Sequence, residues 1–199
     1  KVLYALRDVT ATVVSFPLIV SSILSKKLAA GADVIVLDVK YGSGAFMKNY
    51  TSAKELANQM VKVGKNLKRS VSVVLSNMEQ PLGYAVGHTL EVEEAIETLK
   101  GRGPQDLTEL CLILGAILLL GANQVQELEE GKTLLYKKLH NGEALQKLSD
   151  MISAQGGDPS VIEDYSQMEH AQHILALEAP MTGYVHDIKA LEVGNALKI

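Results

Sequence analysis

The segment LRDVTATVVSFPLIVSSILSKK places hydrogen-bonding side chains at regular intervals in an apolar run. Ser15, Ser22 and Lys26 are spaced by seven and four residues, which places them on one face of a helix, with Ile19 between them. The guanidinium of Arg7 precedes this helix. Cations donate to carbonyl oxygens, a hydroxyl donates or accepts, and an isoleucine packs against a ring. The set therefore suits a small planar ligand with carbonyl oxygens and a ring N–H.

The same residues also fit a simpler interpretation, since a stripe of Ser and Lys is typical of a solvated helix face. Arg7 and Asp8 could likewise form an ordinary surface pair. The segment Gly42-Ser43-Gly44 lacks the third glycine of a dinucleotide-binding loop, and the chain has no GK[ST] motif. The five histidines show no zinc-ligand spacing. Spacing alone therefore goes no further than a polar ligand face.

Three short apolar runs predict strands of a largely parallel sheet covered by helices. They are residues 2–7, 33–40 and 70–76. One helix is expected from Pro17 to about Ala30, and a second from a cap at Thr51 or Ser52 to about Leu67. This order predicts right-handed βαβ crossovers and an α/β fold.

Ligands of open α/β sheets bind at the carboxyl ends of the strands. In the predicted sheet, Arg7, Lys40 and Asn77 stand at those ends.

The rest of the chain predicts helices over residues 90–100, 104–121, 124–140 and 142–155. The apolar run from Leu110 to Ala122 is too short to span a bilayer and predicts a buried helix. A short strand over 173–178 and a helix from about Ile188 follow a glycine-rich break. We expect a central α/β domain over residues 1–170 and the start of a C-terminal α+β domain over 171–199. Because the chain begins inside one predicted element and ends inside another, we expect a fragment of a longer protein.

Composition is that of a globular protein, with 47% hydrophobic and 21% charged residues. The formal net charge of −4 argues against nucleic acid as a partner. The single cysteine, Cys111, excludes an internal disulfide and fits a reducing compartment. We therefore expect a cytoplasmic protein without a membrane partner.

Two runs, YALRDVTATVVSFPLIVSSILSKKLAAGADVIVLDVKYGSGAFMK and PLGYAVGHTLEVEEAIETLKGRGPQDL, closely resemble the thymidine phosphorylase and pyrimidine-nucleoside phosphorylase family. The bacterial pyrimidine-nucleoside branch is the most similar. The resemblance implies a pentosyltransferase of nucleoside metabolism and pyrimidine salvage. In this reaction, phosphate attacks the anomeric carbon of uridine, thymidine or deoxyuridine and yields the base and a (deoxy)ribose 1-phosphate.

The resemblance also implies roles for individual residues. Arg7 and Lys26 would bind a base carbonyl and act as catalytic groups, and Ser22 would bond the ring N–H side. Fixed cations favour the negative charge that grows on the departing base in the transition state. The apolar wall of the base pocket would consist of Tyr4, Val13, Ile19, Ile23 and Phe46.

A potassium ion is implied as well, with the carbonyls of Leu82 and Ala85 and the carboxylate of Glu94 as ligands. From sequence alone, Glu93 and Glu94 would be a solvated helix face. In the family, phosphate and further cation ligands come from segments upstream of this region, and the full-length enzyme is a homodimer. We therefore expect these 199 residues alone to be inactive. Two alternatives stay open: a phosphoribosyltransferase of the anthranilate type and a non-catalytic base-binding fragment.

Overall fold

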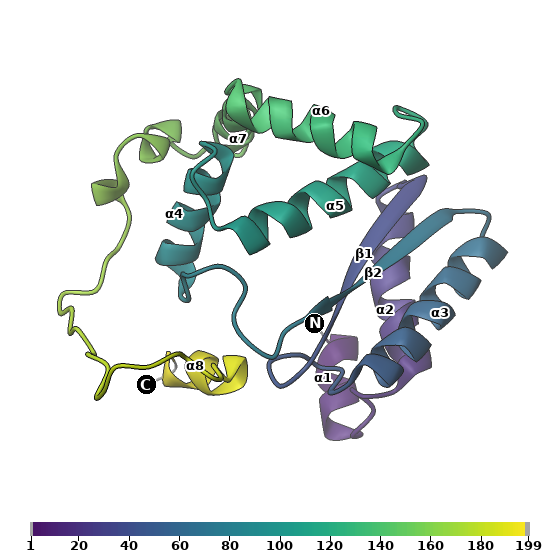
Figure 1. The fold of residues 1–199 in the computed structure, drawn as a ribbon. Helices are drawn as coiled ribbons and strands as arrows, with labels where there is room; N and C mark the ends of the chain where they lie inside the picture. The colour runs from purple at the N-terminus through teal and green to yellow at the C-terminus, as the bar shows by residue number, and fades with distance from the viewer. Residues whose placement is uncertain (1, 198–199) are drawn as a thin grey trace.

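The fold consists of helices arranged around a small parallel sheet (Figure 1). The structure, a computed structural model, describes residues 2–197, and side chains from residue 5 onward. The strands are β1 (Val34–Tyr41) and β2 (Ser70–Asn77). The helices are α1 (Val2–Val9), α2 (Phe16–Ala29), α3 (Tyr50–Asn66), α4 (His88–Leu99), α5 (Gln105–Gly121), α6 (Leu128–His140), α7 (Glu143–Ala154) and α8 (Ala190–Ala196), with 3-10 turns η1 (Pro159–Ile162) and η2 (Tyr165–Gln167).

A βαβ unit made of β1, α3 and β2 is the centre of the fold. The strands pair in parallel from Val34 opposite Ser70 to Tyr41 opposite Asn77. Asn49 caps α3 by accepting a 2.9 Å hydrogen bond from the Ser52 amide, so the cap lies earlier than the predicted Thr51 or Ser52. The α/β class, the parallel pairing and the crossover helix are confirmed.

The main core lies between the sheet and the α2–α3 pair. Ile35, Leu37 and Val39 alternate along β1 and are buried against Leu24 of α2 and Met60 of α3. On the other side of the sheet lie α5 and α6 (Figure 1). The two strands thus lie between two helical layers.

The predicted first strand, residues 2–7, is wrong, because this segment forms α1. Its apolar positions 2, 3, 6 and 9 recur at the spacing of a helix, a period that a short apolar run does not separate from that of a strand. Arg7 therefore lies in the last turn of a helix and not at a strand end.

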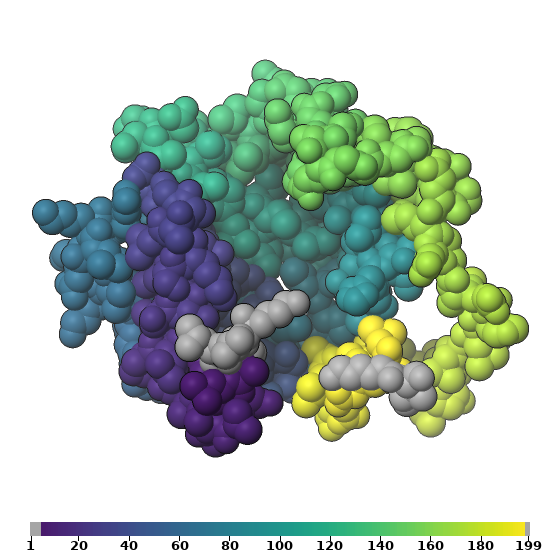
Figure 2. All heavy atoms as spheres, turned by 180° about the vertical axis from the view of Figure 1, so that it is seen from behind, coloured from purple at the N-terminus to yellow at the C-terminus, as the bar shows by residue number. Residues whose placement is uncertain are grey.

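The predicted strand over 173–178 is also wrong. Residues 168–189 form an extended segment on the outside of the molecule, visible from behind (Figure 2). Ile174, Leu175 and Leu177 are each more than 90% exposed. Among the described residues, no strand lies beside this segment to form a ladder. The helix expected after Ile188 is present as α8.

The four central helices are found close to their predicted positions, although α6 begins at Leu128 rather than at residue 124. The prediction that the apolar run of α5 is buried is wrong in part. Ala116 is fully buried, whereas Leu118 and Leu120 are 45% and 38% exposed. Within residues 2–197, no helix has both the length and the apolar character needed to cross a bilayer.

Candidate ligand-binding site

A cavity of about 590 Å³ opens beside the carboxyl end of β1. Its walls come from α1, the α1–α2 connection, α2, α3, the end of β1, the loop that follows β1 and Met78 after β2. Seven of the residues predicted for the base site line it: Arg7, Val13, Ile19, Ser22, Ile23, Lys26 and Phe46. The eighth, Tyr4, belongs to α1, and its side chain lies outside the described residues. Residues as far apart in the chain as Arg7 and Met78 are therefore brought to one cavity.

Helix α2 supplies the polar stripe of this cavity. Pro17 occupies the first turn, where a missing N–H costs no helical hydrogen bond. Val20 and Leu24 are buried in the core at 3% and 2% exposure, which fixes the rotation of the helix. Ser22 and Lys26 consequently point to the cavity, and the Lys26 ammonium lies 3.4 Å from the Ser22 hydroxyl. Ser15, which the spacing places on the same face, occupies the N-cap position of α2 and does not line the cavity.

Arg7 reaches the cavity from α1. Its Nη2 donates a 2.7 Å hydrogen bond to the carbonyl of Val13. The Thr12 amide donates a 2.9 Å hydrogen bond to the carbonyl of Arg7. These two bonds close the connection between the helices into a compact turn. The guanidinium is thereby held at the cavity by its own backbone and by the loop that follows it.

The end of β1 contributes a pair of charges that the sequence analysis did not assign to the site. Asp38 and Lys40 both line the cavity, and the Lys40 ammonium lies 2.7 Å from Asp38 Oδ2. Their i, i+2 spacing within an apolar strand places both on one face, and this pattern was the available signal. Lys40 was noted at a strand end, whereas Asp38 was missed.

The loop Gly42-Ser43-Gly44 does not offer its amides to a ligand. The Ser43 amide donates to Glu79 Oε2 at 2.9 Å, and the Gly44 amide donates to the Met78 carbonyl at 3.0 Å. A Cβ on Gly44 would lie 2.6 Å from the Cβ of Ala190 in α8, so a larger residue here would force the loop or α8 to shift. The loop is thus built for packing against α8 and not for cradling an anion.

Glu94 of α4 anchors the turn that contains Leu82 and Ala85. Its Oε2 accepts hydrogen bonds from the amides of Tyr84 and Ala85 at 2.8 and 3.0 Å. Tyr84, Ala85 and Glu94 line a second cavity, separate from the one that Lys26 lines. Among the described residues, no cluster of three or more His, Cys, Asp or Glu could hold a metal ion. A cation bound here would depend on backbone carbonyls beside one carboxylate.

Three side chains that line the second cavity are joined by short hydrogen bonds. The Arg102 guanidinium donates to Glu97 at 2.7 and 2.9 Å, and the Tyr165 hydroxyl donates to the same carboxylate at 2.5 Å. The hydrogen bonds from Arg102 and Tyr165 lower the pKa of Glu97 to about 2. Burial, and then the bond to Glu97, raises the pKa of Tyr165 to about 12. The cluster ties η2 to α4, the helix that carries Glu94.

The fold and the first cavity together define an α/β domain with a small-molecule cavity at the carboxyl end of a parallel strand. The family model described as "Glycosyl transferase family, a/b domain" matches residues 1–145, and the chain belongs to this family.

Two relatives of known name are similar to this chain along almost its whole length. The chain is 55% identical to the pyrimidine-nucleoside phosphorylase of Geobacillus stearothermophilus over 196 residues, which are 98% of this chain and 45% of that protein. It is 51% identical to the pyrimidine-nucleoside phosphorylase of Staphylococcus aureus (strain USA300) over the same shares of both chains. The chain thus spans a little under half the length of these relatives.

Proposed function

We propose that the protein catalyses phosphorolysis of pyrimidine nucleosides, such as uridine, thymidine and deoxyuridine, to the base and a (deoxy)ribose 1-phosphate. The observation that carries the proposal is the convergence of Arg7, Ser22 and Lys26 on one cavity whose other walls are largely apolar. The names of the relatives, pyrimidine-nucleoside phosphorylases, support the same reaction.

The chemistry of the three side chains suits a pyrimidine. Arg7 and Lys26 donate to a base carbonyl, and Ser22 bonds to the ring N–H side. Phosphate, the co-substrate, attacks the anomeric carbon, and the glycosidic electrons move onto the ring. The two cations stabilise this charge more in the transition state than in the ground state, which is what accelerates the step. Val13, Ile19, Ile23 and Phe46 pack around the ring, and we keep Tyr4 in this set.

We further propose a potassium site at Glu94 with the carbonyls of Leu82 and Ala85. The donor set fits a hard monovalent cation, since it consists of oxygen atoms with one negative charge. The two amide hydrogen bonds to Glu94 support the proposal, because they hold this turn against the carboxylate. A bound cation would neutralise Glu94 and stabilise the turn.

The organisation of the whole protein is part of the same proposal. Residues 1–170 form the base-binding part, and residues 171–199 begin a C-terminal domain. The exposure of Ile174, Leu175 and Leu177 supports this division, because such side chains are normally covered in a folded domain. We propose that the full-length protein acts as a homodimer in the cytoplasm.

The test is an assay of the full-length protein with uridine, thymidine or deoxyuridine and inorganic phosphate, following release of the base. We expect phosphate-dependent release of base and formation of the pentose 1-phosphate. Turnover of anthranilate with a phosphoribosyl diphosphate, and none of nucleosides, would favour the anthranilate-type alternative. Binding of the base without turnover would favour a non-catalytic role.

A further inference from the structure

The pair formed by Asp38 and Lys40 lies in the cavity wall but has no part in the base binding proposed above. The Lys40 ammonium contacts Asp38 Oδ2 at 2.7 Å and donates to the Ser76 hydroxyl at 3.2 Å. The Ser76 hydroxyl in turn donates to Asp38 Oδ1 at 2.5 Å. Since Lys40 and Ser76 are register partners of β1 and β2, the three side chains form a closed ring across the strand pair.

This ring holds the two charges in place while leaving part of their hydrogen-bonding capacity for a ligand. The side chains of Asp38 and Lys40 are 19% and 31% exposed, so both are partly buried, and both residues line the cavity. An ammonium has three N–H donors, and the ring uses two of them. A carboxylate has about four acceptor positions, and the ring uses two. The pair therefore presents a donor and acceptors side by side.

Such a pair selects among the functional groups of a nucleoside and of phosphate. A hydroxyl accepts from an ammonium and donates to a neighbouring carboxylate, so it complements both partners at once. Phosphate offers mainly acceptor oxygens and would be repelled by Asp38. A base carbonyl accepts only, and would leave the carboxylate without a donor. In a nucleoside, the hydroxyls belong to the pentose.

We propose that Asp38 and Lys40 bind a hydroxyl group of the pentose, and that Ser76 is a positioning residue for both. This inference rests on the proposed function. The base would then be held by residues of α1 and α2, and the sugar by the carboxyl end of β1.

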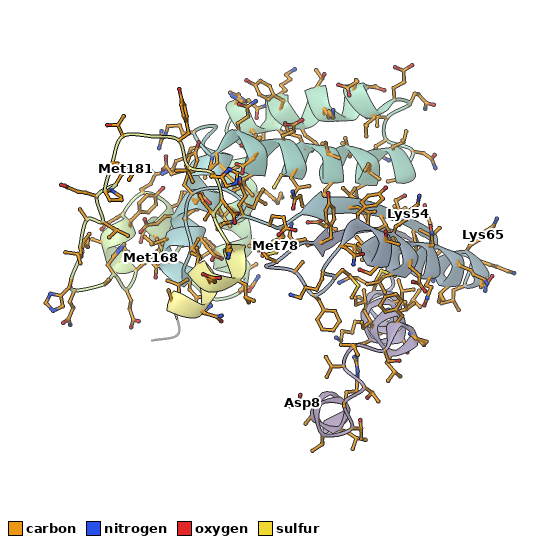
Figure 3. The ribbon with its side chains drawn as sticks, turned by 60° about the horizontal axis from the view of Figure 1, so that its bottom comes forward. Asp8, Lys54, Lys65, Met78, Met168 and Met181 are labelled. Carbon is orange, nitrogen blue, oxygen red and sulfur yellow. The ribbon has the colours of Figure 1, made fainter. Side chains whose placement is uncertain are left out.

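The test compares variants on substrates that differ by one hydroxyl. In the full-length protein, Asp38→Asn, Lys40→Met and Ser76→Ala are assayed with uridine and its 2′-, 3′- and 5′-deoxy analogues. Lys65→Met is the control, since Lys65 lies near the end of α3, on an exposed surface (Figure 3). We expect Asp38→Asn and Lys40→Met to lower kcat/KM by at least about tenfold on uridine, the scale of one hydrogen bond to a charged group. For one deoxy analogue, the same variants should differ little from the parent.

The comparison separates a lost contact from poor folding, because the ratio of kcat/KM between two substrates does not depend on how much enzyme is folded. Ser76→Ala should show the same substrate pattern with a smaller effect. An equal loss on all four substrates, no loss at all, or a rise confined to the KM for phosphate would overturn the inference. Absence of turnover by the parent would instead overturn the proposed function.

Discussion

Arg7 Nη2 donates a 2.7 Å hydrogen bond to the carbonyl of Val13, and both residues line the same cavity. One guanidinium therefore holds the α1–α2 turn closed and also lines the cavity. A planar fork with five N–H donors can do both at once, whereas an ammonium is a single point charge. Replacing Arg7 with lysine therefore tests whether the site needs both contacts of the guanidinium.

We predict that Arg7→Lys lowers kcat/KM for uridine by about tenfold or more, the scale of a lost charge-assisted hydrogen bond. The lysine can replace the contact with Val13 or the contact with the base, but not both. The measurement is steady-state kinetics on the full-length protein, with the melting temperature recorded alongside. Unchanged kinetics in the lysine variant would show that the fork is not needed for the base.

Glu94→Gln should weaken the dependence of activity on potassium. Glutamine keeps an acceptor oxygen for the amides of Tyr84 and Ala85 but removes the negative charge. We expect the potassium concentration for half-maximal activity to rise by about tenfold or more, the scale of a lost contact with a charged group.

The control for this titration is Glu91→Gln, on the same helix, where Glu91 Oε1 accepts from the Gly87 amide at 3.0 Å. Identical potassium titrations of the Glu94 variant and the parent would exclude Glu94 as a ligand.

The Glu97 cluster predicts a specific dependence of stability on pH. The pKa of Glu97 is lowered from 4.5 to about 2, chiefly by the hydrogen bond from Arg102. A lowered carboxyl pKa contributes stability above the unfolded value, and this contribution is lost as pH falls from about 4.5 to about 2. Melting curves of the parent and Glu97→Gln should therefore differ most near neutral pH and converge in acid. Glu55→Gln, on the exposed side of α3, serves as the control, and a constant gap across this range would refute the assignment.

Gly64 tests the packing of α3 on β2. A Cβ at this position would lie 2.2 Å from Val71 Cγ2, so Gly64→Ala overpacks the contact between helix and strand. We expect a loss of about 1–3 kcal/mol in the free energy of unfolding. This loss outweighs the gain of up to about 1 kcal/mol in helix propensity. Gly194→Ala in α8 is the control, because no atom lies within 4 Å of its added Cβ. Urea unfolding that ranks the two variants the other way would contradict this packing.

Much of the fold could be predicted from local pattern. The two parallel strands, the crossover helix and α4 to α7 follow from apolar runs bounded by glycine, proline and polar residues. The errors occur where the period is short or the partner is distant. Residues 2–7 are too few to distinguish a helix from a strand, and residues 173–178 are apolar without a neighbouring strand in the described chain.

The candidate site also contains residues whose proximity the sequence predicts and residues whose proximity depends on the fold. Ser22, Lys26 and Ile19 share a helix face, so their proximity follows from spacing. Their meeting with Arg7 and Phe46 depends on how α1 and the loop after β1 pack, which no local pattern encodes. The resemblance to a known family grouped those residues in advance. Asp38 was missed because its i, i+2 spacing with Lys40 becomes informative only once Ser76 of the neighbouring strand is seen beside both.

The central claim, that Lys26 stabilises the departing pyrimidine, is tested most directly by comparing Lys26→Ala with Lys27→Ala in the full-length protein. The two lysines are neighbours on α2 and both are exposed, but only Lys26 lies in the cavity wall. Removing one donor that stabilises transition-state charge costs about 10²–10³ in rate, so kcat/KM for uridine should fall by about a hundredfold or more in Lys26→Ala. Lys27→Ala should stay close to the parent. Near-parental phosphorolysis by Lys26→Ala, or an equal loss in both variants, would contradict the account.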